Sequence, residues 1–467
     1  MNSEKKDDIA GIRALEQLEK PNYMLMSIQR IIVLFVISCC VVVIVYYTPM
    51  PEEYFESCDR VCNELDWPMI CRVKLVVEVY KTFSKSCGSC TADGGPCPST
   101  CISGDGRERG VLAVNRGLPA PALHVCHNDI LVVDVVHRAA SHALALHWRG
   151  QPQKETPFMD GAPMLTQCPQ PAYTTFQYKF RASAVGTHMY HAHSAADAAD
   201  GLAGAFVVRQ SPKLDPIRGL YDVDTAEYTI FIAEWGHSMG PLAGISSEIP
   251  QAESLLINGK GKTEENPNKI LSKFLVTPGK RYRFRMIYGG GAKGCPVKMS
   301  ITEHIVKLVA LDGHSVEPVN VESIEINRGE RADFVLHADK DSKTYSIKIV
   351  AAESCQKELK GEAELVYDGT TENTFTKDDT NDVKVFCSVF SDSCNSDRIV
   401  CLNELNSTHK MPEQLSGSLD FLAKGCTNTG WLYTPVTPNP NYNMHSPHTI
   451  TLPSVYPESS LSIIAIG

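Results

Sequence analysis

Short blocks of hydrophobic and polar residues alternate along most of this 467-residue chain. Between residues 109 and 210, runs such as GVLAVN, HVCHNDILVVDVVH, TTFQYKFRA and GAFVVRQ are separated by Gly, Pro and Asn, a pattern typical of strands and turns. A second series of the same kind runs from residue 226 to residue 369. The pattern predicts an all-β fold with two β-sandwich domains, at residues 107–210 and 221–370.

One strand of the second series alternates basic and aromatic residues in the segment TPGKRYRFR. Successive side chains of a strand point to opposite faces of the sheet. We therefore expect a half-buried strand with Tyr282 and Phe284 turned inward, and with its basic residues turned outward. These basic residues are Arg281, Arg283 and Arg285.

A long apolar segment lies near the N-terminus. Residues 31–47, IIVLFVISCCVVVIVYY, carry no charge over 17 positions, and with the apolar residues before them they approach the ~20 needed to cross a bilayer. Arg30 and further basic residues precede the segment and three glutamates follow it, so residues 1–30 are predicted to be a cytoplasmic tail. The sequence favours a single-pass type II anchor in the plasma membrane with an extracellular C-terminal region. A cleaved signal peptide, which would give a secreted protein, and a buried core helix are the alternatives.

Cysteine usage agrees with an extracellular location. Two of the 17 cysteines lie inside the apolar segment and fifteen follow it, many in a Gly- and Pro-rich, loop-like segment at residues 48–106. Such density predicts a disulfide framework, although Cys87 and Cys90 have the spacing of half a zinc site. Because fifteen is odd, one thiol is free or pairs outside this chain. The disulfide candidates are Cys58, Cys62, Cys71, Cys87, Cys90, Cys97, Cys101, Cys126 and Cys168.

The net charge and a glycosylation sequon limit the classes of partner that we expect. The net charge of −10 argues against nucleic-acid binding. Asn406 begins an Asn-Ser-Thr glycosylation sequon. The expected partners are a membrane at residues 31–47 and either a small reducing substrate or an extracellular protein ligand.

Two short motifs carry metal-binding potential. His147 and Arg149 in LHWRG, and His191 and His193 in HMYHAH, are each two residues apart, so each pair shares one face of a strand. Imidazole suits copper, zinc, iron and nickel, so the residue type does not choose the metal. An isolated His-x-His pair is more often a surface or core feature than a site.

The surrounding sequence resembles a known family. LHWRG, FMDGAPMLTQCP and GTHMYHAHSAADAADGLAGAFVVRQ resemble the first cupredoxin domain of multicopper oxidases, in particular the insect laccase-like members. LLINGKG, PGKRYRFRMI, LDGHSVEPV and GERADFVL resemble the second domain, and the resemblance covers residues 58–370. NMHSPHTITLPSVYP resembles the first strand of a third domain, so we expect a linker at 371–424 and an incomplete third domain at 425–467.

The resemblance implies tandem Greek-key cupredoxin domains that use copper. By position, His147 matches a type 2 copper ligand, whereas His191 and His193 match type 3 ligands. Arg149 stands at another type 3 position, and a guanidinium has no lone pair with which to bind a metal. The third-domain motifs that would supply the type 1 copper site do not appear before Gly467.

Three functions follow from these observations. The first is a membrane-tethered, laccase-like family protein whose copper oxidase activity is lost or impaired, a pseudoenzyme. The second is an active oxidase of diphenols, ascorbate or ferrous iron that reduces dioxygen to water and is represented by a partial chain. The third is a module that binds one copper ion. We expect His188 to face away from His191, and we expect structural roles for the Asp160–Gly161 turn and for Glu234 and Trp235.

Overall fold

The computed structural model describes residues 23–47, 58–64, 67–88, 98, 101–139, 143–239, 252–262, 271–291, 294–351, 359–369, 385–387, 399–401 and 405. The chain divides into two compact units, residues 1–56 and residues 57–467. Several sequence predictions lie outside the described residues: Cys90, Cys97, the Asn406 sequon, the third-domain segment 425–467 and residues 1–22 of the predicted cytoplasmic tail.

The first unit contains one long helix, α2 (Tyr23–Tyr47). Its stretch Tyr23–Val43 is long and apolar enough to cross a membrane, a property that an N-terminal signal sequence shares. The helix starts eight residues before the predicted boundary at residue 31, because Arg30 continues the helix instead of ending it. Together with the disulfides described below, this helix indicates the secretory pathway.

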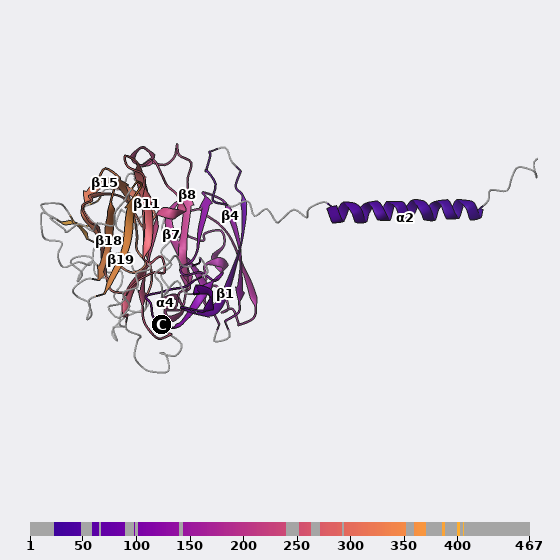
Figure 1. The fold of residues 1–467 in the computed structure, drawn as a ribbon, viewed down its shortest axis with the longest axis horizontal. Helices are drawn as coiled ribbons and strands as arrows, with labels where there is room; N and C mark the ends of the chain where they lie inside the picture. Colours follow the sequence, from indigo (N-terminus) through magenta and orange to yellow (C-terminus); the bar gives the residue numbers. More distant parts are fainter. Residues whose placement is uncertain are drawn as a thin grey trace, which may run out of the picture. The chain divides into compact units, whose positions relative to one another are not determined.

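The second unit is built mostly of β-strands (Figure 1), which confirms the predicted fold class. Its first domain pairs two four-stranded sheets, one in the order β2-β1-β4-β6 and the other in the order β3-β8-β7-β5. The strands of the first sheet are β1 (Ile70–Lys81), β2 (Gly110–Val114), β4 (Ile130–His137) and β6 (Thr175–Arg181). Those of the second are β3 (Ala120–Cys126), β5 (Leu146–Arg149), β7 (Gly186–Ala192) and β8 (Ala203–Arg209). The short helices are η1 (Lys85–Cys87), η2 (Pro157–Met159) and α4 (Ala195–Ala199).

Strand β1 corrects the predicted start of this domain. It lies inside the segment 48–106 that the sequence predicted to be loop-like, yet it pairs with both β2 and β4. The stretch ICRVKLVVEVYK alternates residues that face the core with residues that face solvent, as a half-buried strand does. Neighbouring cysteines and glycines hid this alternation in the sequence.

The second domain has a six-stranded and a seven-stranded sheet, in the orders β10-β9-β12-β17-β14-β15 and β11-β19-β18-β13-β16-β20-β21. The first contains β9 (Thr229–Trp235), β10 (Ser254–Ile257), β12 (Arg281–Gly290), β14 (Val306–Leu311), β15 (His314–Val321) and β17 (Arg331–His337). The second contains β11 (Ser272–Val276), β13 (Val297–Ile301), β16 (Ser323–Ile326), β18 (Thr344–Ala351), β19 (Lys360–Tyr367), β20 (Val385–Cys387) and β21 (Ile399–Cys401). Two short helices, η3 (Arg218–Leu220) and η4 (Ala226–Tyr228), lie in the connection from the first domain.

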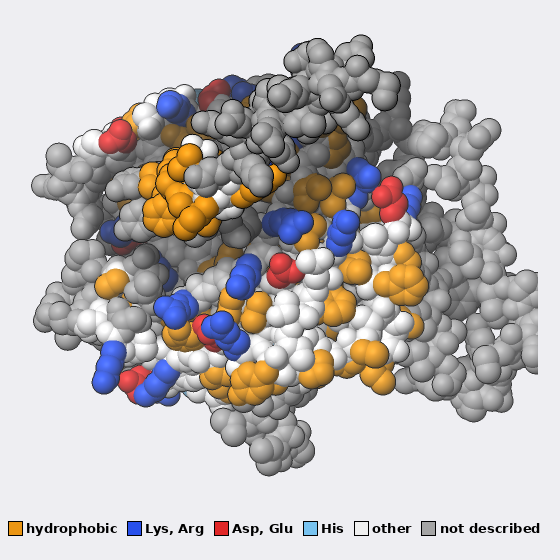
Figure 2. Space-filling view, turned by 90° about the vertical axis from the view of Figure 1, so that its right-hand side faces the viewer, with side chains coloured by type: hydrophobic (Ala, Val, Ile, Leu, Met, Phe, Trp, Pro, Cys, Tyr) orange, Lys and Arg blue, Asp and Glu red, His pale blue; other side chains and the backbone are white. Residues whose placement is uncertain are grey.

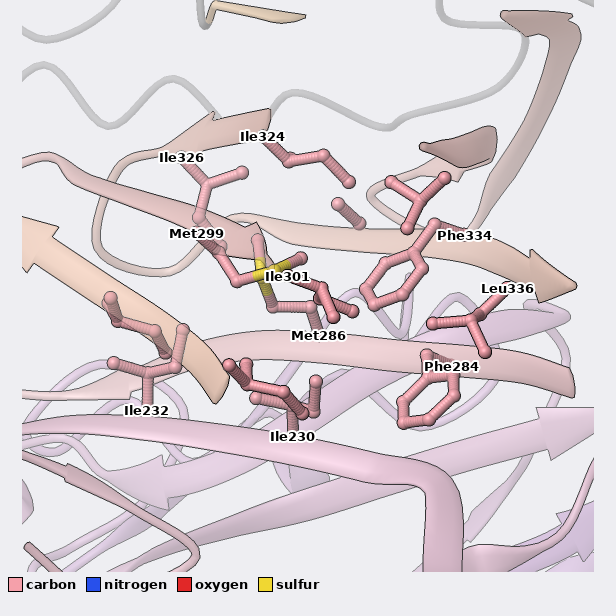
Figure 3. Close-up of a cluster of buried hydrophobic side chains, with 14 of the residues drawn as sticks. Ile230, Ile232, Phe284, Met286, Met299, Ile301, Ile324, Ile326, Phe334 and Leu336 are labelled. Carbon is pink, nitrogen blue, oxygen red and sulfur yellow. The ribbon is translucent and has the colours of Figure 1, made fainter. Parts of the chain in front are cut away.

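Side chains from both sheets meet in the core of the second domain (Figure 3). Phe284 of β12 and Phe334 of β17 stack with their ring centroids 5.3 Å apart. Met299 and Ile324 face them from the other sheet. Strands β20 and β21 extend that sheet beyond residue 370, so part of the predicted linker 371–424 belongs to the second domain.

Three disulfides fix the beginning of the first domain. They join Cys58 to Cys71, Cys62 to Cys126, and Cys87 to Cys101. Cys168 was a disulfide candidate, but it is an exposed free thiol. Cys295, which was not among the candidates, is disulfide-bonded.

Candidate metal centre

Strands β5 and β7 bring the predicted ligand positions together. They pair antiparallel, with His147 directly opposite His191 and Arg149 directly opposite Met189. Residues directly opposite each other in such a pair project from the same face of the sheet. The two motifs are 44 residues apart in the sequence, so only the pairing of the strands makes them one site.

The two faces of this sheet have different environments. Leu146, Trp148 and Tyr190 point into the core of the first domain, where Trp148 packs against a group of aromatic rings. On the opposite face, Met189 packs with Phe231 and Ile287 of the second domain. His147, Arg149 and His191 therefore lie on the face that the second domain partly covers.

Hydrogen bonds orient two of the imidazoles for metal binding. Nδ1 of His147 donates to the carbonyl oxygen of Asp160 at 2.8 Å, and Nδ1 of His191 donates to the carbonyl oxygen of Ala192 at 2.7 Å. Since a carbonyl only accepts, each Nδ1 carries the proton and each neutral ring keeps its Nε2 lone pair. A second partner that fixes the tautomer in this way is typical of metal-binding histidines.

The electrostatic environment keeps these rings neutral. Burial is the main cause that lowers the pKa of His191 to about 4; the hydrogen bond to Ala192 opposes this shift, and Arg149 and the neighbouring histidines add to it. Burial also lowers the pKa of His147, to which Asp160 contributes in the opposite direction. Neutral imidazole is the form that binds a metal, so both residues fit a copper ligand.

His193 lies just beyond the end of β7 and is exposed. The ring centroid of His147 is 5.5 Å from that of His191 and 6.5 Å from that of His193. Among the described residues, no three His, Cys, Asp or Glu side chains converge on one point as the ligands of a single ion would. The 5.5 Å spacing of His147 and His191 suits two imidazoles that bind one ion or two neighbouring ions.

Arg149 shares the face of the histidines, but its side chain is anchored on the second domain. Its Nε donates to the carbonyl oxygen of Gly329 at 2.9 Å. Gly329 has φ +87°, and a Cβ built on it would lie 2.6 Å from Cζ of Arg149, so the guanidinium lies against the glycine backbone. The described part of the chain gives Arg149 no carboxylate partner. A charged group without a lone pair therefore occupies a ligand position, and it does not fit copper.

Other residues of the second domain hold the strand that carries His191. Nε of Arg331 donates to the carbonyl oxygen of Thr187 at 3.0 Å, and Nη1 of Arg285 donates to its hydroxyl at 2.6 Å. The sequence prediction that the arginines of β12 turn outward was wrong for Arg283 and Arg285, which are 6% and 2% exposed. The side chain of Arg281 is 39% exposed beside Asp222. Both buried arginines pair with Asp333 of β17 in the second domain, at 2.6 Å from Arg283 and 3.1 Å from Arg285, and Arg285 also reaches the first domain at Thr187. The sequence hinted at this through the acidic residues Asp224 and Asp333, but gave no indication of which arginines they would meet.

The remaining candidates have structural positions. A Cβ on Gly161 would lie 1.6 Å from the carbonyl oxygen of Leu146, so the Asp160–Gly161 turn packs directly on β5 and holds His147. Glu234 accepts hydrogen bonds from the Tyr288 hydroxyl and from the backbone of Cys295. His188 is buried against Phe206, on the opposite face of β7 from His191.

The contact between Arg149 and Gly329 can be measured with a matched glycine. Gly279 has φ +83° and no heavy atom within 4 Å of its built Cβ, so Gly279→Ala should cost only the ~1–2 kcal/mol of a left-handed backbone. Gly329→Ala should cost about 1 kcal/mol more, because the new methyl group displaces the guanidinium from its acceptor. Urea unfolding of Gly329→Ala and of Gly279→Ala, each with and without Arg149→Ala, measures this excess in the free energy of unfolding. An excess that persists without Arg149 would show that it has another cause.

Comparisons with known proteins agree with this geometry. Two family models, both described as multicopper oxidase, match residues 98–213 and 226–370. Laccase-1 of Agaricus bisporus is 35% identical over 261 residues, which cover 54% of this chain and 49% of that protein. Laccase-1 of Trametes villosa is 34% identical over 260 residues, which cover 54% of this chain and 48% of that protein. The chain thus spans about half the length of these relatives.

Solved structures share the fold. The laccase of Botrytis aclada superposes with a TM-score of 0.55 at 22% identity, covering 68% of this chain and 56% of that one. Fet3p, described as a multicopper oxidase that functions in iron import, gives a TM-score of 0.55 at 21% identity over 75% of this chain and 59% of its own. The strand order, the paired histidine motifs and both family matches lead to one conclusion: this chain belongs to the multicopper oxidase family.

Proposed function

We propose that this protein is a laccase-like member of its family, of the insect type, whose copper oxidase activity is lost or impaired. One observation carries the proposal: Arg149 stands on the ligand-bearing face beside His147 and His191, with its guanidinium fixed on Gly329. Copper is the cofactor expected from the family, and when bound it supplies the electron transfers that reduce dioxygen. His147 and His191 would hold it, whereas Arg149 adds a fixed positive charge where an imidazole belongs.

We also propose that α2 anchors the protein in the plasma membrane with residues 57–467 outside the cell. The apolar helix and the disulfides support this location. The proposed partner of the folded region is an extracellular protein or a small reducing molecule. On the face drawn in Figure 2, Lys and Arg are spread between apolar patches, with acidic side chains beside several of them, which does not favour a nucleic-acid partner.

The alternative is an active oxidase of diphenols, ascorbate or ferrous iron. The neutral, correctly oriented rings of His147 and His191 favour it, because hydrogen bonds that prepare a metal ligand are intact.

Oxygen uptake separates the two functions. The protein is produced from its natural gene, so that any residues after Gly467 are included, and is purified in detergent with copper supplied. Oxygen uptake is measured with catechol, ascorbate and ferrous iron. We expect the wild type to match a His147→Ala, His191→Ala double variant, since neither should assemble a working copper cluster. Uptake by the wild type well above that of the double variant, together with intense blue absorption, would establish the active oxidase instead.

A further inference from the structure

A polar cavity of about 320 Å³ lies between the two cupredoxin domains, and none of the four ligand positions His147, Arg149, His191 and His193 lines it. Its walls come from the N-terminal segment at residues 60–62, the end of β8, the connection 210–225, strand β12 and the turn between β14 and β15. Ligand sites occur preferentially at such domain boundaries, and this volume is at the small end of their usual range. The cavity plays no part in the function proposed above.

The carboxylates in its wall are already saturated. Asp224 accepts from Nε and Nη2 of Arg285, one bond to each oxygen. Asp222 accepts three bonds from Arg281, through the backbone N–H, Nε and Nη2. Asp215 accepts from the backbone of Ile217, from the Tyr221 hydroxyl and from Arg283. These acceptors leave little capacity for a ligand that donates hydrogen bonds.

Donors, in contrast, are in excess. Arg209 uses its Nη2 on Asp59 and on the carbonyl oxygen of Arg60, while its Nε is buried and makes no hydrogen bond within the described residues. Arg218, at the exposed rim, uses Nη1 on the carbonyl oxygen of Tyr221 and has no carboxylate partner there. A buried N–H without an acceptor is costly, which favours a ligand that accepts hydrogen bonds in this cavity.

A second buried group close to Arg209 lacks hydrogen bonds. His124 of β3 is 7% exposed, and neither ring nitrogen has a partner among the described residues. Its pKa is lowered to about 4, mainly by burial; Asp59 opposes this shift, whereas the charges of Arg285 and Arg209 contribute to it. A neutral His124 has one N–H to donate and adds no negative charge to this region.

We propose that this cavity binds a small oxyanion, the carboxylate or phosphoryl group of a small molecule, through Arg209 and Arg218. Guanidinium groups bind such oxygens through paired, charge-assisted hydrogen bonds. The aspartates of the wall do not prevent binding, because each of them faces an arginine that neutralises it.

Calorimetry on the metal-free, full-length chain in detergent tests the site. Inorganic phosphate and succinate are titrated separately at constant ionic strength set with sodium chloride. We expect at least one of them to bind with a Kd of about 1 mM or tighter. Binding of phosphate only identifies a phosphoryl ligand, binding of succinate only identifies a carboxylate, and binding of both supports a general oxyanion site.

Arginine variants show whether binding occurs in this cavity. Arg209→Gln and Arg218→Gln should each weaken binding about tenfold or more. Arg181→Gln removes a half-exposed arginine of β6 that pairs with Glu155, and it should leave the affinity unchanged. Arg218 lies at the rim, so its variant remains informative if Arg209→Gln fails to fold.

Two results would overturn the proposal. One is the absence of a heat of binding for both anions up to about 20 mM. The other is an equal loss of affinity in the Arg181→Gln control, which would show nonspecific binding to surface charge. Neither result bears on the copper chemistry, because the protein contains no metal in these titrations.

Discussion

Replacing Arg149 with histidine is expected to raise the affinity of this protein for copper on the order of 10–100-fold, because the change supplies a missing ligand and removes a fixed charge. His147 and His191 already present neutral rings on the same face, so the new imidazole joins ligands that are oriented in advance. Competition with a chromophoric copper chelator, followed by metal analysis after dialysis, measures the change.

A matched variant separates the two causes. Arg149→Gln removes the charge but cannot serve as an imidazole ligand, so it should recover only a small part of the gain. If glutamine and histidine raise the affinity equally, electrostatic repulsion alone excluded the metal. If the wild type already binds copper as tightly as the histidine variant, the proposed loss of function is wrong.

Asp333→Asn is expected to destabilise the protein by about 3–5 kcal/mol, the usual cost of removing one partner from a buried ion pair. Asp333 is 1% exposed and lies 2.6 Å from Arg283 and 3.1 Å from Arg285, both of them buried. Although burial lowers the pKa of Arg283, the carboxylates of Asp333, Asp224 and Asp215 raise it above its usual value. The arginines therefore stay charged, and in the variant their buried positive charges lack the negative charge of Asp333.

Chemical denaturation followed by tryptophan fluorescence measures this loss. Arg138→Gln is the control, since Arg138 pairs with Glu78 at 3.0 Å with 56% of its side chain exposed, and such pairs contribute at most about 1 kcal/mol. Equal effects of the two variants would show that the buried network adds no more stability than a surface ion pair. Asp333→Asn should also loosen the Arg285 side chain. Its hydrogen bond to Thr187, which attaches β7 to the second domain, should then weaken.

The sequence predicted the strands best where each one buries a single face. The alternation in TTFQYKFRA and TPGKRYRFR follows directly from the two-residue period of a strand, and both segments are strands, β6 and β12. The sequence did not predict β1, because the cysteine-rich segments around it made the two-residue alternation hard to recognise. It also failed for Arg283 and Arg285, because alternation says which side chains share a face but not what covers that face.

For the candidate site, the sequence determined which residue types stand at the ligand positions, and the spacing of two placed each pair on one face. Only the tertiary structure decided that His147 lies opposite His191, since strand pairing depends on contacts between segments far apart in the chain. The structure also decided what Arg149 does. Its charge and lack of a lone pair are properties of the residue, but its acceptor, the carbonyl oxygen of Gly329, is 180 residues away and is brought near by the packing of the second domain on the first.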